Sequence, residues 1–171
     1  AAGVDVFGSL ARWTEETFRF TGGDSTPAAE TARPQVENEA YLAIQAEVDK
    51  LDIDIPVVPT WFPEGYELQD TQLSNPDMMS FESIDCLFKG AENHSFVITI
   101  KKYAEGHDIS GNVFEKDGQS VIQYLGGDKR FYIMSNNSRK TATWSNGQIF
   151  VSIGGDLSED ALKLIIDSIG G

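Results

Sequence analysis

Hydrophobic residues recur at helical spacing in three parts of the chain. The stripes are Phe7, Leu10, Ala11, Thr14 and Phe18 in residues 4–20; Tyr41, Ile44, Val48 and Leu51 in residues 37–51; and Leu162, Ile165, Ile166 and Ile169 near the end. Residues three or four positions apart share one face of a helix, so the spacing predicts three amphipathic helices. Ser158 or Asp156 is suited to cap the last helix, and Gly170 to end it.

Between Tyr66 and Ile153 the hydrophobic period falls to two, which is typical of strands buried on one face. The clearest examples are Ile84, Cys86 and Phe88, followed by Phe96, Ile98 and Ile100. Two dipeptides, Asp117-Gly118 and Asn146-Gly147, predict hairpins, because they supply the positive φ values of primed turns. We therefore expect an α+β fold: an antiparallel meander of about seven to eight strands, packed on one face by N-terminal and C-terminal helices.

The predicted elements divide the chain into three regions. Residues 1–20 hold the N-terminal amphipathic helix, which packs on the domain or lies against a bilayer. Residues 21–36 are rich in Gly, Pro, Ala, Ser and Thr without a periodic apolar pattern, so they are interpreted as a flexible linker. Residues 37–171 are expected to form a single α+β domain, as the length of the chain allows one sizeable core.

The formal net charge of −14 makes polyanionic molecules poor partners for this protein. Residues 24–70 contain eleven acidic residues and two basic ones. Nucleic acids and anionic lipid headgroups require clustered cations, so we expect no nucleic-acid partner.

Residue types that perform chemistry are scarce. The chain has one cysteine, Cys86, and two histidines, His94 and His107. Cys86 falls on the apolar side of its strand, whereas His107 is beside Asp108 in a predicted turn. No metal-binding spacing or phosphate-binding loop is present. We therefore expect no catalytic residues, metal site or cofactor, with a hydrolase using Cys86, or His107 with Asp108, as one alternative.

The segment Pro59–Leu68, PTWFPEGYEL, places three aromatic residues among prolines and a glycine. Trp61, Phe62 and Tyr66, together with Trp144, are the candidate residues for binding a ligand or partner. The alternative is a structural corner between helix and sheet, in which Pro63 takes the second position of a turn and Gly65 the fourth.

Three segments carry a resemblance to a known family: Thr60–Leu68, Trp144–Ile153 (WSNGQIFVSI) and Gly155–Ile169 (GDLSEDALKLIIDSI). Over residues 56–169 the chain resembles the domain of unknown function 4367 family. The resemblance implies a domain on the cell-surface side of the cytoplasmic membrane of Gram-positive bacteria. Such domains follow a single upstream transmembrane segment, sometimes in proteins similar to anti-sigma factors. The family has no established catalytic residues.

The resemblance and the lack of catalytic motifs together favour an extracytoplasmic, non-enzymatic binding or sensory domain of a membrane-anchored protein. Its partner is an unknown protein or small molecule, and a regulatory role is one option. A second alternative is a carrier or sensor of apolar ligands on a curved sheet. Its concave face would be lined by Phe96, Ile98, Phe131, Ile133, Phe150 and Val151.

Overall fold

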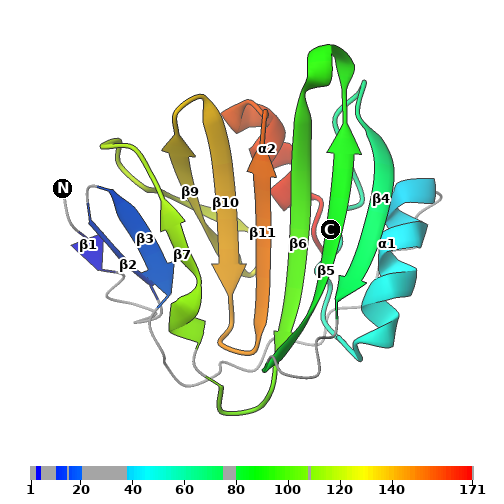
Figure 1. Ribbon diagram of the computed structural model, residues 1–171, viewed down its shortest axis with the longest axis horizontal. Coiled ribbons are helices and arrows are strands. Elements are labelled where there is room, and N and C mark those ends of the chain that lie inside the picture. The colour runs from blue at the N-terminus through cyan, green and yellow to red at the C-terminus, as the bar shows by residue number, and fades with distance from the viewer. Residues whose placement is uncertain are drawn as a thin grey trace.

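The computed structural model describes residues 3–4, 11–14, 16–20, 38–74, 80–107 and 109–170. These residues form a large antiparallel sheet, a smaller sheet and two α-helices (Figure 1). The predicted α+β class is therefore confirmed.

The large sheet has seven strands in the order β4-β5-β6-β11-β10-β9-β8. Their bounds are Glu67–Ser74 (β4), Phe81–Lys89 (β5), Ser95–Tyr103 (β6), Ile122–Gly126 (β8), Lys129–Asn136 (β9), Arg139–Ser145 (β10) and Ile149–Gly155 (β11). Every pairing is antiparallel, and β11 lies beside β6. The predicted meander thus consists of two parts, β4 to β6 and β8 to β11, joined by the β6–β11 pair.

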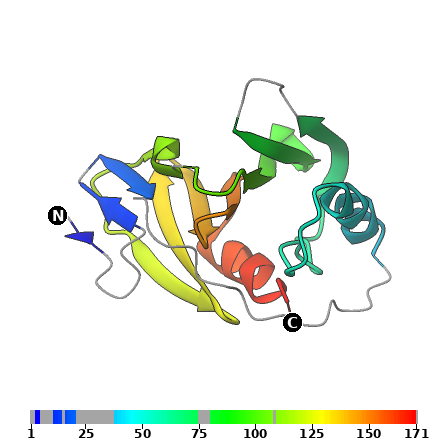
Figure 2. The same ribbon diagram turned by 90° about the horizontal axis from the view of Figure 1, so that it is seen from below.

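Both helices pack on one face of this sheet (Figure 2). Helix α1, Glu39–Lys50, begins at Asn38, whose side-chain oxygen accepts hydrogen bonds from the backbone N–H groups of Ala40 and Tyr41. Helix α2, Glu159–Asp167, is capped by Ser158, as predicted. The main core between helices and sheet includes Ile44 and Val48 of α1, Leu162, Ile165 and Ile166 of α2, and Ile84, Phe96, Ile98, Phe131 and Val151 of the sheet.

A second core lies on the opposite face of the large sheet. It is covered by the small sheet, which has the order β1-β2-β3-β7, with bounds Gly3–Val4 (β1), Ala11–Trp13 (β2), Thr17–Phe20 (β3) and Val113–Glu115 (β7). Phe18 of β3 packs 5.1 Å from the Tyr132 ring, and Phe20 packs 5.9 Å from the Phe150 ring, centroid to centroid. The large sheet is consequently covered on both faces where β6, β11 and β9 carry the second core, and the fold has three layers there.

The predicted helix in residues 4–20 is wrong in the part that the structure describes, where residues 11–13 and 17–20 form strands. The segment Thr17–Phe20 also alternates, and both phenylalanines point into the second core while Arg19 is exposed. Burial of these two rings and pairing with β7 outweigh the helical spacing, which depended on Thr14 as an apolar position. The predicted linker in residues 21–36 lies outside the described residues.

Of the two predicted hairpins, one is confirmed. Asn146-Gly147 connects the paired strands β10 and β11, and Gly147 has φ of 95°. The hairpin at Asp117-Gly118 is wrong, because β7 pairs with β3 and β8 pairs with β9. Here the chain crosses from the small sheet to the large one, and the N–H of Asp117 donates to the Ser135 carbonyl of β9. Two short 3₁₀ turns, η1 (Ala91–Asn93) and η2 (Ile109–Gly111), flank β6.

Candidate functional site

The aromatic segment Pro59–Leu68 is attached at its start to the end of α2. Pro59 forms an isolated antiparallel bridge with Ile169. The Ser168 hydroxyl accepts hydrogen bonds from the backbone N–H groups of Thr60 (3.1 Å) and Trp61 (3.2 Å). These contacts join positions more than one hundred residues apart and fix where the segment enters the sheet.

A tight turn follows the attachment point. The N–H of Tyr66 donates to the Pro63 carbonyl at 3.3 Å, and Gly65 has φ of 81°. Proline therefore occupies the first position of the turn and glycine the third, rather than the predicted second and fourth. A positive φ at the third position is the geometry of a type II turn, which favours glycine there. The turn directs Phe62 and Tyr66 toward the same side of the sheet.

The rings of Phe62 and Tyr66 continue a row of aromatic side chains from the main core. Phe62 stacks on Phe88 with centroids 4.8 Å apart, and Phe88 stacks on Phe96 at 4.5 Å. Tyr66 meets Phe96 edge-on at 5.1 Å, and its hydroxyl donates to the Asp156 carbonyl at 2.6 Å. Burial, with the nearby Asp156 charge, raises the pKa of the Tyr66 phenol, and the hydrogen bond to the Asp156 carbonyl holds the ring in one orientation.

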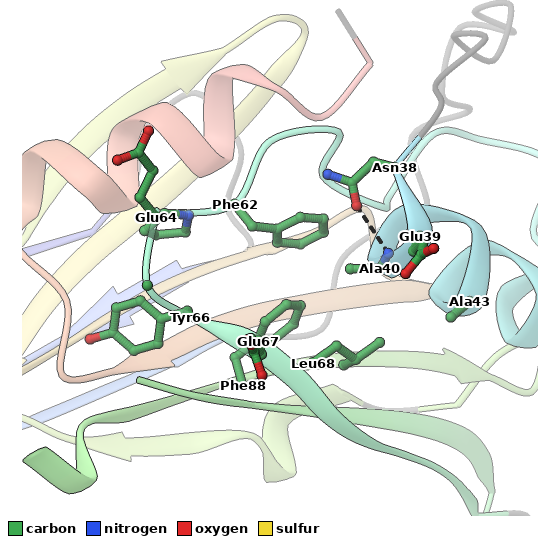
Figure 3. Close-up of a pocket in the computed structure, with 12 residues that line it drawn as sticks. Asn38, Glu39, Ala40, Ala43, Phe62, Glu64, Tyr66, Glu67, Leu68 and Phe88 are labelled. Carbon is green, nitrogen blue, oxygen red and sulfur yellow. Dashed lines mark hydrogen bonds between the residues drawn. The ribbon is translucent and has the colours of Figure 1, made fainter. Parts of the chain in front are cut away.

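A groove of about 670 Å³ opens beside this aromatic row (Figure 3). One wall is the first turns of α1, and the other is the turn with the start of β4 and the end of β5. The lining comprises Asn38, Glu39, Ala40, Ala43, Phe62, Pro63, Glu64, Gly65, Tyr66, Glu67, Leu68 and Phe88. It contains three carboxylates, three aromatic rings and no lysine, arginine or histidine. The groove is therefore both aromatic and acidic.

The structure brings together two of the four predicted binding residues. Phe62 and Tyr66 both line the groove. Trp61 is adjacent and 37% exposed, but it is not part of the lining. Trp144 lies elsewhere, in β10, where it is 7% exposed and packs against Phe131 with Lys129 over its ring.

The opposite wall was missed by sequence reasoning. This wall consists of Asn38, which caps α1, with Ala40 and Ala43 of its first turns. Phe88 was also missed as a lining residue: it lies in the same wall as the turn but comes from β5, more than twenty residues beyond it. The alternation of β5 correctly marked Phe88 as facing the core. No local signal, however, indicates which helix end lies next to which strand end.

Of the residues of the hydrolase alternative, Cys86 and His107 lie on opposite faces of the large sheet, and Asp108 lies outside the described residues. Cys86 is fully buried in the main core, and burial, with the Asp85 and Glu47 charges, raises the pKa of its thiol to about 12. The His107 ring stacks on Tyr103, a member of the second core. In the part of the chain that the structure describes, no group of three His, Cys, Asp or Glu residues is arranged to hold a metal ion.

Native protein is expected to resist alkylation of Cys86 by iodoacetamide at mildly alkaline pH. The reactive species is the thiolate, and a fully buried thiol with a pKa of about 12 supplies almost none. Intact mass measurement over time checks this, with the same protein in urea as the control that must become labelled. Rapid labelling of the native protein would contradict the burial of Cys86 and would again make it a candidate nucleophile.

The six residues predicted to line a carrier's concave face do not share one face. Five of them, Phe96, Ile98, Phe131, Ile133 and Val151, are in the main core and are at most 2% exposed. Phe150 points to the second core on the other side of the sheet. The five are packed with α1 and α2, so their role in the described structure is that of core residues.

Comparison with known proteins identifies a family to which the chain is similar. The model of the family described as "Domain of unknown function (DUF4367)" matches residues 56–169. No curated protein matches the chain. The matched region contains all seven strands of the large sheet and α2, whereas α1 precedes it. One wall of the groove thus belongs to the matched region and the other does not. Among the described helices, none has the length and apolar character needed to cross a membrane.

Proposed function

The chain belongs to the DUF4367 family, and from this premise we propose that it is a non-enzymatic binding domain whose ligand occupies the groove between α1 and the turn at Pro63–Tyr66. The observation that carries the proposal is the composition of the groove. The half-buried rings of Phe62 and Tyr66 lie near three glutamates, Glu39, Glu64 and Glu67, and the lining has no basic side chain. The third ring, Phe88, is fully buried between Phe62 and Phe96 and supports Phe62 from behind.

This composition matches a ligand that carries a cationic group on an apolar body. A cation is attracted to the face of an aromatic ring, typically by about 0.5–2 kcal/mol depending on its desolvation. Carboxylates at the edge of the groove add attraction, and the net charge of −14 attracts cations from a distance. The N–H groups of Ala40 and Tyr41 already donate hydrogen bonds to Asn38, so these two groups are not available to bind an anion at the start of α1.

We further propose that the domain lies on the cell-surface side of the cytoplasmic membrane, as the sensory part of a membrane-anchored, regulatory protein. Support comes from the resemblance of the three sequence segments to domains in such chains. Cleavage of the domain by a protease added to intact cells would support this location. Protection of the domain in intact cells, together with its cleavage after the cells are lysed, would contradict it.

Benzyltrimethylammonium is expected to bind the groove more tightly than benzyl alcohol, its neutral aromatic counterpart. Replacing Phe62 by Ala should weaken binding of the cation by about tenfold, because the face of the ring that is not stacked on Phe88 is lost. The double variant Glu64→Gln/Glu67→Gln should weaken it by about threefold, as expected for solvent-exposed charges. Isothermal titration calorimetry and amide NMR shifts provide the measurement.

The matched control is Trp61→Ala, which removes the neighbouring aromatic residue outside the lining. It should bind benzyltrimethylammonium like the original chain. Equal binding of the cation and benzyl alcohol would refute the cationic ligand, and a stronger effect of Trp61→Ala than of Phe62→Ala would refute the groove. Thermal unfolding of each variant separates loss of binding from loss of fold.

A further inference from the structure

A second hollow lies on the face of the large sheet opposite the main core. It measures about 260 Å³ and is formed by β6, β11 and the segment from η2 to β7. Its polar groups come from Thr99, Lys101, Asn112 and Ser152, and its apolar walls come from Val113, Phe114 and Phe150. The hollow is thus separated by the sheet from the groove and shares no lining residue with it.

Lys101 is the basic residue of this hollow. Its side chain is half-buried, with Nζ 4.8 Å from the centre of the Phe81 ring and 5.5 Å from that of Phe150. Nζ donates one hydrogen bond, to Asn112 Oδ1 at 3.2 Å. An ammonium group has three N–H donors, so two remain for other acceptors.

The ammonium group of Lys101 forms no ion pair with any residue that the structure describes. Asp85 is the carboxylate whose charge it feels, but Asp85 Oδ1 is bonded to the Thr99 hydroxyl at 2.6 Å. Burial lowers the pKa of the Lys101 ammonium, and Asp85 partly opposes this. A half-buried cation without an anionic partner is costly, because it has lost water without gaining a full counter-charge. An anion in the hollow would restore that counter-charge.

Asn112 holds Lys101 in this arrangement. Its Nδ2 donates to the Tyr103 hydroxyl at 2.7 Å and to the Ile109 carbonyl at 3.0 Å. These two bonds fix the amide plane, so that Oδ1 is presented to Nζ of Lys101. The cation is consequently positioned by a hydrogen-bonded residue rather than left on a flexible surface.

The walls and the size of the hollow indicate what kind of body the anion carries. The Phe114 and Phe150 rings stack with centroids 6.0 Å apart, and Val113 is 55% exposed at the strand beside them. An enclosed apolar cavity of about 150 Å³ can hold a benzene molecule, and this hollow, which measures about 260 Å³ and is open to solvent, has room for one ring with a small substituent. The lining of the hollow has one basic residue, and the protein as a whole has a net charge of −14. The hollow therefore suits a monoanion better than a phosphate, which requires several hydrogen-bond donors.

We propose that this hollow binds a small monocarboxylate with an aromatic or aliphatic body, whose carboxylate pairs with Lys101 while its body packs against Val113 and Phe114, with the buried Phe150 ring stacked on Phe114. The Ser152 hydroxyl is a second donor at the same site. This site is independent of the groove, and it remains if the proposed cationic ligand of the groove fails.

Benzoate is the probe, with benzamide as the neutral counterpart of the same shape. We expect benzoate to shift the amide NMR signals of Gly111, Val113 and Phe114 and to bind about tenfold more tightly than benzamide, because only benzoate gains the charged pair. The variant Lys101→Met should weaken benzoate binding by about tenfold and leave benzamide binding unchanged.

The control with the same loss of charge is Lys50→Met, on the exposed surface of α1. It should bind benzoate like the original chain. A second variant, Val113→Glu, adds a carboxylate at an exposed position and should weaken benzoate but not benzamide. The proposal would be overturned by equal affinities for benzoate and benzamide, by unchanged benzoate binding in Lys101→Met, or by NMR shifts located elsewhere. It would also be overturned if neither benzoate nor hexanoate, the probe with an aliphatic body, shifted any signal.

Discussion

The variant Gly155→Ala is expected to lose about 3–5 kcal/mol of unfolding free energy, which is a large part of the stability of a domain of this size. A Cβ atom at Gly155 would lie 2.5 Å from Phe96 Cα and 2.6 Å from Phe96 Cβ, and it would also overlap the Ser95 carbonyl oxygen. These are mostly backbone atoms, which cannot move aside as the end of a long side chain can. Gly155 has φ of 157° and pairs with Phe96 at the junction of β11 and β6.

The matched control for this experiment is Gly118→Ala. A Cβ atom there has no neighbour within 4 Å, and its φ is not in the positive region. The change should alter stability by less than about 0.5 kcal/mol, as is usual for a surface substitution. Urea unfolding followed by circular dichroism measures both variants. A Gly155→Ala protein as stable as Gly118→Ala would contradict the close approach of β11 to β6.

Leu162→Ala should cost about 2–5 kcal/mol, whereas Leu164→Ala on the same helix should cost less than about 0.5 kcal/mol. Leu162 is fully buried in the main core, and its truncation leaves a cavity between α2 and the sheet. Leu164 is 52% exposed and contributes little to that packing. Both changes replace leucine by alanine in a helix, so the gain in helix propensity is equal and cancels in the comparison.

The measurement is the difference in urea midpoint between the two variants at constant slope. Similar losses for Leu162→Ala and Leu164→Ala would mean that α2 does not pack on the sheet through the described face. Retention of the groove in both variants can be checked with benzyltrimethylammonium, since neither residue lines it.

The local sequence pattern was sufficient to predict an element where the residues that share one face of it are close together in the sequence. The stripe of Tyr41, Ile44 and Val48 predicted α1, and Ser158 marked the start of α2. The alternation in β5 and β6 predicted the buried face of each strand, and Asn146-Gly147 predicted the hairpin between β10 and β11. In these cases the spacing alone determines which side chains share a face.

The local sequence pattern predicted the wrong element where the structure of a segment depends on a partner that is distant in the sequence. The segment Thr17–Phe20 became a strand because β7 pairs with it and because the second core receives its two phenylalanines. The run Phe131–Met134, buried at all four positions, is a signal for a strand covered on both faces, and it points to the second layer. It does not reveal that the N-terminal segment supplies this layer.

The sequence by itself thus determined the α+β class, both described helices, the faces of the central strands and the resemblance to the family that was later found. The tertiary structure alone decided the three layers, the partners of β3 and β7, the groove beside Phe62 and Tyr66, and the hollow around Lys101. The physical reason is that periodicity records which side of an element is apolar, whereas a groove or hollow depends on which distant elements meet and on what their packing leaves open.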